Sequence, residues 1–412
     1  MKRISLFLLL FLLLKATVMY SQDGHPETNF RIVPVSPNAA SLGTFGMIPT
    51  DNYVGQANLT IPIYEIDLDG KKFPIALSYH TDGTRVAQEA TWIGLGWTLQ
   101  AGGCVVRQVQ GTDDFAARGC YNLTDAPWMT NPRFEVTDQN LEKYMGYFKG
   151  DYDAEPDMFY FNAGGHSGSM YFDVLKNNRQ LNAVPTIQTQ EKVVKMVYNT
   201  SNKTWTMTDL EGYVYSFSTK EITYYFLNTI DFFQTDITRS HIFPYYNEPQ
   251  IVTAWMLDSV TSPNGGKIMF SYKKESIFTP ISTTEDVISL SKIVNGQLSS
   301  QSPQYFTNKF NYNYSYSKIE QWILSAITFE GGKVEFGTTD REDIESAETG
   351  KKVQKLSSIK VSDTAGNLIK TTMLEYKYLL SGMAATTNGY DDRLLLSKVY
   401  DVAGSKKNNV YT

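Results

Sequence analysis

The chain has 412 residues, enough for two or three domains at roughly 150 residues per domain. Hydrophobic residues make up 42% of the chain and charged residues only 19%, a composition that excludes a disordered chain and a coiled coil. The net charge of −6 gives the chain no attraction for nucleic acid or an anionic membrane. We therefore expect a soluble, β-rich, extracytoplasmic protein whose function must be sought in its motifs.

The N-terminus has the pattern of a secretory signal peptide. Lys2 and Arg3 precede an apolar run at residues 4–14, and a polar stretch follows. This run is shorter than the roughly 20 residues that span a bilayer as a helix, and no later stretch is long and apolar enough. We expect export of the chain, cleavage near Gln22 and no transmembrane helix in the mature protein. The alternative is a buried core helix.

Strand patterns begin at residues 59–63 and 73–79, where every second residue is large and apolar. Asp69-Gly70 between the two segments predicts a tight hairpin turn. Pro62 and Pro74 cannot donate a backbone hydrogen bond, so each must sit where its strand has no partner on that side. The hairpin is therefore expected near a sheet edge.

Cys104 and Cys120 are the two cysteines of a chain that we expect to leave the reducing cytoplasm. A disulfide between them would stabilise the fold by about 3 kcal/mol if the geometry allows it. The alternative is two unpaired thiols. Two cysteines without nearby histidines do not make a zinc site.

Acidic residues at 151–157 form the best metal candidate, because alternate carboxylates in a loop can converge on a calcium ion. However, Pro156 stands where an EF-hand loop needs glycine, and Asn162 stands where it needs a bidentate glutamate. A solvated acidic loop is the favoured interpretation, and a turn is favoured for Asp113-Asp114. No metal or cofactor is predicted.

No catalytic residue is predicted. Gly165-His166-Ser167-Gly168 suggests a hydrolase elbow, but the second glycine follows Ser167 directly and the motif requires one residue between them. Gly94-Leu95-Gly96 lacks the third glycine of a dinucleotide loop, and close backbone packing beside the flanking tryptophans explains it better. The four histidines are scattered, at positions 25, 80, 166 and 241.

Further strands are expected at residues 158–162, 169–174, 212–218, 222–226 and 312–316, and one short helix is expected at residues 140–148. The fold class is therefore all-β, with antiparallel, sandwich-like sheets. In the last of these strands, Tyr312, Tyr314 and Tyr316 line one face. Such a row of phenol rings can stack on sugars, and it can equally pack across strands.

A hairpin unit is repeated in the second half of the chain. Residues 255–270 match residues 322–336 with one residue dropped in the turn, and looser copies follow at 356–369 and 395–404. The glycine pairs 265–266 and 331–332 occupy the same place and are expected to supply positive φ. The last copy is expected to have little or no return strand, as a capping hairpin or as the front part of a longer reading frame.

Several segments of the chain together form a pattern that is shared with a known protein family. The most specific is W-I-G-L-G-W at 92–97, followed by Ala101-Gly102-Gly103. The resemblance spans residues 37 to 400. The other matching segments are 37–43, 48–49, 53–55, 59–64, 77–80, Arg107, Gly111, 155–159, 161–162, Gly168 and the hairpin units that begin at Trp255 and Trp322. Together these segments resemble the N-terminal region of bacterial secreted Rhs or YD-repeat proteins. The resemblance implies β-sheet shells or surface assemblies, some of which deliver a C-terminal toxin.

The sequence thus predicts a signal peptide at 1–21, an extended segment at 22–52, a β domain with the W-I-G-L-G-W motif at 53–185, a β domain ending in the first hairpin repeat at 186–275, and a region of YD-type hairpin repeats at 276–412. The expected function is that of a non-enzymatic, secreted or cell-surface structural and interaction module. Its partners would be other surface proteins, glycans or a toxin cargo. The alternatives are a glycan-binding adhesion module and, third, an extracellular hydrolase.

Overall fold

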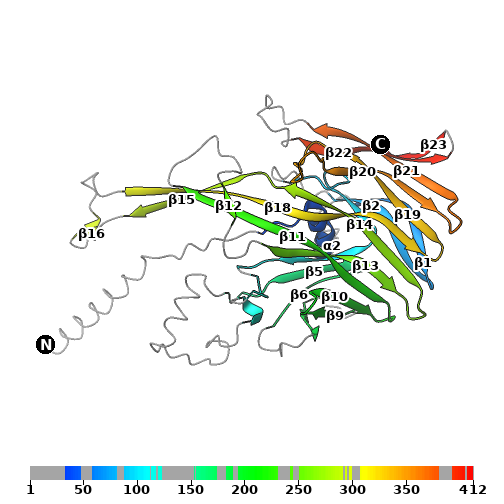
Figure 1. Ribbon diagram of the computed structural model, residues 1–412, viewed down its shortest axis with the longest axis horizontal. Helices are drawn as coiled ribbons and strands as arrows, with labels where there is room; N and C mark the ends of the chain where they lie inside the picture. The colour runs from blue at the N-terminus through cyan, green and yellow to red at the C-terminus, as the bar shows by residue number, and fades with distance from the viewer. Residues whose placement is uncertain are drawn as a thin grey trace, which may run out of the picture. The chain divides into compact units, whose positions relative to one another are not determined.

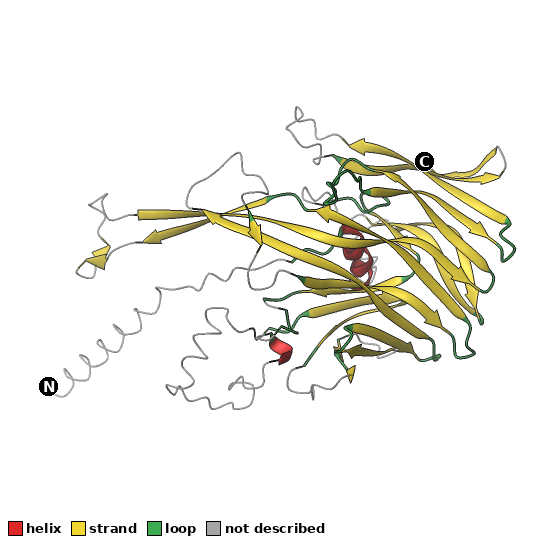
Figure 2. Ribbon diagram, viewed as in Figure 1, coloured by secondary structure: helices red, strands yellow, loops and turns green. Residues whose placement is uncertain are grey.

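The structure is a computed structural model. It describes residues 33–47, 58–80, 88–111, 113–116, 119–122, 153, 155–173, 182–188, 194–230, 242–244, 250–290, 293–294, 297–298, 307–379, 392–403 and 406–411. The chain divides into two compact units, formed by residues 1–32 with 110–156 and by residues 33–109 with 157–412. Regular structure is almost entirely antiparallel β-strand (Figure 2), which confirms the all-β class. Within the described residues, no helix has the length and apolar character to cross a membrane. The expected signal peptide and the helix at 140–148 lie outside the described residues.

The described part of the smaller unit is a compact turn. Asp113 accepts a hydrogen bond through its side chain from the N–H of Phe115 at 2.8 Å, and a single 3-10 turn, η1 (Cys120–Asn122), follows. Asn122 donates from its amide to the carbonyl of Phe115 at 2.9 Å. These bonds confirm the turn expected at Asp113-Asp114.

The first sheet of the larger unit contains β1 (Asn58–Leu68), β2 (Lys71–His80) and β3 (Trp97–Gln100) in that order. Asp69 and Gly70 have φ of 52° and 92°, which is the conformation that a two-residue hairpin turn requires. Pro62 lies on β1, which pairs only with β2 among the described strands. Pro74 lies on β2 outside its pairing with β3. The predicted hairpin and the placement of its prolines are confirmed.

The other strands of the larger unit form a continuous antiparallel network (Figure 1). In chain order they are β4 (Gly103–Gln108), β5 (Met158–Ala163), β6 (His166–Tyr171), β7 (Asn182–Ala183), β8 (Thr186–Ile187), β9 (Val194–Asn199), β10 (Thr204–Asp209), β11 (Val214–Ile230), β12 (Phe243–Pro244), β13 (Ile251–Thr261), β14 (Lys267–Phe278), β15 (Ser282–Leu290), β18 (Thr307–Phe329), β19 (Gly332–Asp340), β20 (Gln354–Ser362), β21 (Leu368–Leu379), β22 (Arg393–Ala403) and β23 (Lys406–Tyr411). A separate hairpin pairs β16 (Ile293–Val294) with β17 (Gln297–Leu298). Strands from all three expected β regions pair with one another, as in β4 with β13 and β14 with β18.

Two expected strands, 212–218 and 222–226, are parts of one long strand, β11. Its pairing with β13 shifts register near Phe217 and Thr219. Asp258 on β13 fills the irregularity, because its carboxylate accepts hydrogen bonds from the hydroxyl and the N–H of Thr219 at 2.5 and 3.1 Å. The polar residues around 218–221 looked like a strand end in the sequence, but they form a bulge inside a strand.

The hairpin copies are β13–β14, β18–β19, β20–β21 and β22–β23. They confirm the repeat and its matched positions. The fourth copy differs from the expectation, because β23 is a return strand of six residues that pairs with β22. The strand reads Lys-Lys-Asn-Asn-Val-Tyr, four polar residues followed by two apolar ones, so it lacks the alternation that predicts a strand from sequence.

Three hairpin turns share one geometry, at 209–213, 262–266 and 363–367. In each turn, the N–H of the first residue donates to the carbonyl oxygen of the fifth residue. The fourth residue is a glycine, and its N–H donates to the carbonyl oxygen of the first residue. These glycines have φ of 85°, 95° and 84°. The first residue is Asp or Ser, and its side-chain oxygen accepts the N–H of the fifth residue. Each turn is therefore closed by its own first side chain.

The two glycine pairs of the repeat are not equivalent, which corrects the sequence expectation. Gly265 carries the positive φ in a five-residue turn, whereas Gly332 carries it, at 148°, after a shorter turn. The residue dropped in the second copy moves the strained position by one place. Gly332 also lies against the next hairpin, where a Cβ atom would stand 2.1 Å from the carbonyl oxygen of Ser362.

The segment 22–52 is not extended throughout, because residues Pro37–Met47 form helix α2. Ser36 caps this helix: its hydroxyl accepts the N–H of Ala39 at 3.1 Å, and Pro37 occupies the first helical position. The Ser-Pro start was a signal that the sequence analysis missed. Figure 1 shows α2 beside β5, and its Ala39 packs among Cys104, Val106, Ala254 and Met256.

Candidate functional site

The W-I-G-L-G-W segment folds as a tight loop around Thr91. The Thr91 hydroxyl donates to the carbonyl of Trp97 at 2.6 Å and accepts the N–H of Ile93 at 3.1 Å. Gly94 has φ of 119°, and a Cβ atom on it would lie 2.9 Å from the backbone nitrogen of Leu396 on β22. The expected close backbone packing is therefore confirmed, and its partner is the fourth hairpin copy.

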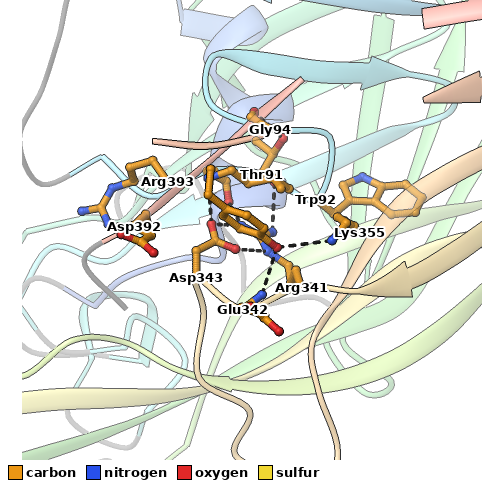
Figure 3. Close-up of polar contacts among 12 residues, drawn as sticks. Thr91, Trp92, Gly94, Arg341, Glu342, Asp343, Lys355, Asp392 and Arg393 are labelled. Atoms are coloured by element: carbon orange, nitrogen blue, oxygen red, sulfur yellow. Dashed lines mark hydrogen bonds and ion pairs between the residues drawn. The ribbon is translucent and has the colours of Figure 1, made fainter. Parts of the chain in front are cut away.

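Arg341 fixes this loop from the segment that follows β19 (Figure 3). Its guanidinium binds both carboxylate oxygens of Asp343, at 2.8 and 2.6 Å. The same group donates to the carbonyls of Thr91 at 3.0 Å and Ala90 at 3.2 Å. The side chains of Arg341 and Asp343 are 2% and 1% exposed, so this is a buried ion pair with its donors satisfied.

Backbone bonds join the same loop to two hairpin copies. Leu95 donates to the carbonyl of Leu394 on β22 at 2.8 Å, and Leu356 on β20 donates to the carbonyl of Trp92 at 2.9 Å. Leu394 in turn donates its N–H to Asp343 at 3.1 Å. We call this set, built on Arg341, Asp343 and the 91–97 loop, the Arg341 junction.

A second polar chain ties α2 to the junction. Asn38 accepts the N–H of Trp92 at 2.9 Å and donates to the side chain of Gln321 at 3.2 Å. Gln321 donates to the Glu275 carboxyl at 3.4 Å, and the N–H of Gln354 donates to it at 3.1 Å. Burial raises the pKa of Glu275 to about 7. Five separate elements therefore meet through hydrogen bonds.

The junction can fix the positions of the elements that it joins, but it leaves few polar groups available for catalysis or ligand binding. The polar atoms of Arg341 and Asp343 are bonded to this chain. No group of three or more metal-ligating side chains occurs in the part of the chain that the structure describes. The sequence analysis missed Arg341 and Asp343, because the run 340–343 has the pattern of a solvated charged turn and only the fold buries it.

The two cysteines belong to different units of the structure. Cys104 lies on β4 in the larger unit, Cys120 lies in η1 of the smaller unit, and both are buried thiols in the structure. Burial raises the pKa of the Cys104 thiol well above its usual value. The Cys104–Cys120 bond stays a prediction.

The tyrosine row on β18 is mostly buried. Tyr314 is 0% and Tyr316 is 8% exposed, and both belong to a core cluster with Ile242. The ring of Tyr316 stacks on Phe226 with centroids 4.5 Å apart. Of the three, Tyr312 is partly exposed. The sequence left two interpretations open, cross-strand packing and sugar contact. The burial of these rings favours cross-strand packing.

The rejected hydrolase motif lies at the start of β6. Ser167 is exposed, while His166 lies 3.8 Å from the carboxylate of Asp209. Adjacent side chains on a strand point to opposite faces, so His166 is not placed to take a proton from Ser167. His80 lies on β2, whereas His25 and His241 are outside the described residues.

The acidic stretch at 151–157 is divided between roles. Asp157 forms a buried ion pair with Arg107, whose Nε lies 2.8 Å from the carboxylate. Asp153 accepts the N–H of Glu155 at 2.9 Å. Asp151 lies outside the described residues. Asp157 is thus committed to structure, and the solvated-loop interpretation does not hold at this position.

Comparisons with known proteins return similar folds but no family. No family model and no curated protein matches the sequence. The crystal structure of TcdB2-TccC3-Cdc42 is similar with a TM-score of 0.41 and 10% identity, over 87% of this chain and 15% of that chain. The Photorhabdus luminescens Tc holotoxin pore gives a TM-score of 0.39 and 10% identity, over 92% and 16%. The chain thus spans about 15% of the length of these neighbours.

Proposed function

We propose that this chain is a non-enzymatic structural and interaction module of an exported, toxin-associated assembly of the Rhs or YD-repeat kind. The observation that carries the proposal is the Arg341 junction. It pins the W-I-G-L-G-W loop, the most specific element of the resemblance, onto the third and fourth hairpin copies. A sheet whose strands are fixed in this way serves as a rigid surface against which other chains can pack. Its partner class is a polypeptide, either another surface protein or a toxin cargo.

The distribution of polar groups supports a scaffold over an enzyme. Two deeply buried arginines are each paired with a buried carboxylate, Arg107 with Asp157 and Arg341 with Asp343. Ser167 and His166 diverge, and Glu275 bonds to an amide and a backbone N–H. Catalytic groups would instead converge on a shared open space. The tyrosine row gives little support to glycan binding, because two of its three rings lie in the core.

The test uses the full chain produced with its native N-terminus. We expect export, an N-terminus near Gln22 on sequencing, and co-purification of a second polypeptide with the wild type that is lost in Arg341→Met. Ser167→Ala is the matched control and should retain the partner. Turnover on generic ester and glycoside substrates should be absent in both. A hydrolysis that Ser167→Ala removes would revive the hydrolase alternative, and binding to a glycan array would revive the adhesion alternative.

A further inference from the structure

The tip of the β1–β2 hairpin meets the turn that follows β10. Lys71 is the first residue of β2, and Asp209 is the last residue of β10. The Nζ of Lys71 lies 2.5 Å from Oδ2 of Asp209 and 2.9 Å from Oε2 of Glu211. The hydroxyl of Tyr213 donates to the carbonyl oxygen of Leu68 at 3.0 Å and fixes the tip beside this turn. An amine and a carboxyl that are 138 positions apart are thus held in contact.

Hydrogen bonds fix both oxygens of the Asp209 carboxyl, whose side chain is 1% exposed. Oδ1 accepts the backbone N–H groups of Glu211 at 3.0 Å and Tyr213 at 2.9 Å. Oδ2 accepts the hydroxyl of Tyr215 at 3.1 Å as well as the amine of Lys71. The carboxyl therefore keeps one orientation, with Oδ2 toward the amine and Oδ1 toward two N–H groups that can stabilise a negative charge.

Aromatic rings enclose the contact. The Nζ of Lys71 lies 4.8 Å from the ring centroid of Tyr213 and 6.0 Å from that of Tyr215. The ring of Phe73 lies 6.3 and 6.4 Å from the same two rings. The Lys71 side chain is only 16% exposed, and both tyrosines are buried. Such surroundings limit the access of water, which would otherwise hydrate both groups and reverse a condensation between them.

Neither the turn nor the hairpin requires such a contact. In the equivalent turn that begins at Asp363, the second carboxylate oxygen accepts the side-chain amide of Asn367 at 2.9 Å instead. The neighbouring Lys72 pairs with Asp67 at 2.8 Å, but both of these side chains are more than half exposed. Lys71 thus differs from these two sites, because its amine is both enclosed and in direct contact with a fixed carboxyl.

We propose that the side chains of Lys71 and Asp209 condense into an amide, with Glu211 as the base. Two of the three protons on Nζ pass to Oδ2 of Asp209, one directly and one through Glu211. The lone pair of Nζ forms a bond to Cγ, the Cγ–Oδ2 bond breaks, and Oδ2 leaves as water with those two protons. The ion pair thus becomes one amide and one water, so no oxidant, reductant or further reactant is needed.

The reaction would start from the ion pair and would be slow. Burial lowers the pKa of Lys71, but its hydrogen bonds to Asp209 and Glu211 outweigh burial and hold that pKa above its ordinary value. The proton transfer is therefore uphill. Fixed reacting groups offset this cost, because good orientation corresponds to effective concentrations of about 10⁵ M or more. The reaction needs to occur only once in each chain, after which the first sheet is joined covalently to β10.

The test is the intact mass of the full, folded chain, measured after denaturation and reduction. We expect a mass lower by one water than that of the unlinked chain with the same N-terminus. Trypsin should no longer cleave after Lys71, and a branched peptide should join residues 204–220 to a fragment that contains Lys71. A wild-type chain that keeps the full mass and is cleaved after Lys71 would overturn the proposal. Fragmentation that places the loss of water at another site would overturn it as well.

Three variants assign the roles. Lys71→Arg keeps the positive charge without a primary amine and should abolish the link. Glu211→Gln removes the base at an exposed side chain and should slow the link about ten-fold or more, read as the linked fraction against time in freshly synthesised chain. Lys72→Arg is the matched control and should form the link as wild type does. A link in Lys71→Arg, or wild-type kinetics in Glu211→Gln, would contradict the assigned chemistry. The wild-type mass alone decides the proposal if a variant does not fold.

Discussion

The indole Nε1 of Trp322 donates to the carbonyl oxygen of Lys220 at 2.8 Å. Trp255, at the matching position of the preceding hairpin copy, donates to the carbonyl oxygen of Lys203, also at 2.8 Å. Lys203 lies in the turn between β9 and β10, and Lys220 lies on β11. The duplicated tryptophan thus makes a duplicated contact, in which each copy is tied to backbone that precedes it in the chain.

Loss of Arg341 should be among the most damaging single changes. Arg341→Met leaves the buried Asp343 carboxylate without its cation, and removing one partner of a buried pair costs about 3–5 kcal/mol. We expect a loss of this size in the free energy of unfolding, measured by urea denaturation. Lys333→Met breaks the exposed pair with Glu335 and should cost less than about 1 kcal/mol.

The double variant Arg341→Met/Asp343→Leu removes both charges. It therefore separates the contribution of the ion pair to stability from the contribution of side-chain packing. It should be more stable than Arg341→Met alone, because no unpaired charge remains. If the double variant loses as much stability as the two single variants combined, the buried pair is not the source of the effect.

The two glycines of the second repeat turn should respond differently to valine. Gly332→Val places a Cβ atom 2.1 Å from the Ser362 carbonyl at a φ of 148°, and we expect a loss of about 3 kcal/mol or more. Gly331→Val meets only the end of the Phe329 ring, at 2.9 Å, which can move. It should cost about 1 kcal/mol. Thermal melting of the two variants side by side checks the order, and equal losses would contradict it.

Stability should depend on pH through Glu275. Its pKa is about 7 in the folded chain against an ordinary 4.5, so the folded state holds a proton that the unfolded state has lost between these values. The resulting stabilisation is complete below about pH 4.5 and disappears as pH rises through 7, a difference of about 3 kcal/mol. Glu275→Gln should flatten this slope in urea titrations across pH 4.5–8. A slope unchanged by the substitution would show that other groups produce it.

Export of the chain would permit a bond between the two cysteines, and two unpaired thiols are the alternative. If Cys104 and Cys120 pair, the denatured chain should show no thiol that reacts with a maleimide until a reductant is added. Denaturation is necessary because Cys104 is buried and its pKa is raised, so a thiol there would react slowly in the native state. Two reactive thiols in the denatured, unreduced protein would rule the bond out.

The parts of the fold that repeat over short distances could be predicted from the sequence. Alternation and turn residues located β1 and β2, and the duplicated tryptophan segment located two hairpins. Helix α2 was missed, since its apolar positions have weak periodicity and its start depends on the cap at Ser36. Arg341 and Asp343 were missed for a different reason: their partners, such as Thr91, are about 250 positions away, and sequence spacing carries no record of such a contact.

The self-closed turns at 209–213, 262–266 and 363–367 have a consequence for the order in which the fold is made. Each turn draws its side-chain bond and its glycine from five consecutive residues, so it can form as soon as those residues are available. A chain that crosses a membrane starting from its N-terminus would form these turns one at a time, in sequence order. The contacts of Arg341 join residues that are far apart in the sequence, so they would form later. They would then stabilise hairpins whose strand register is already set.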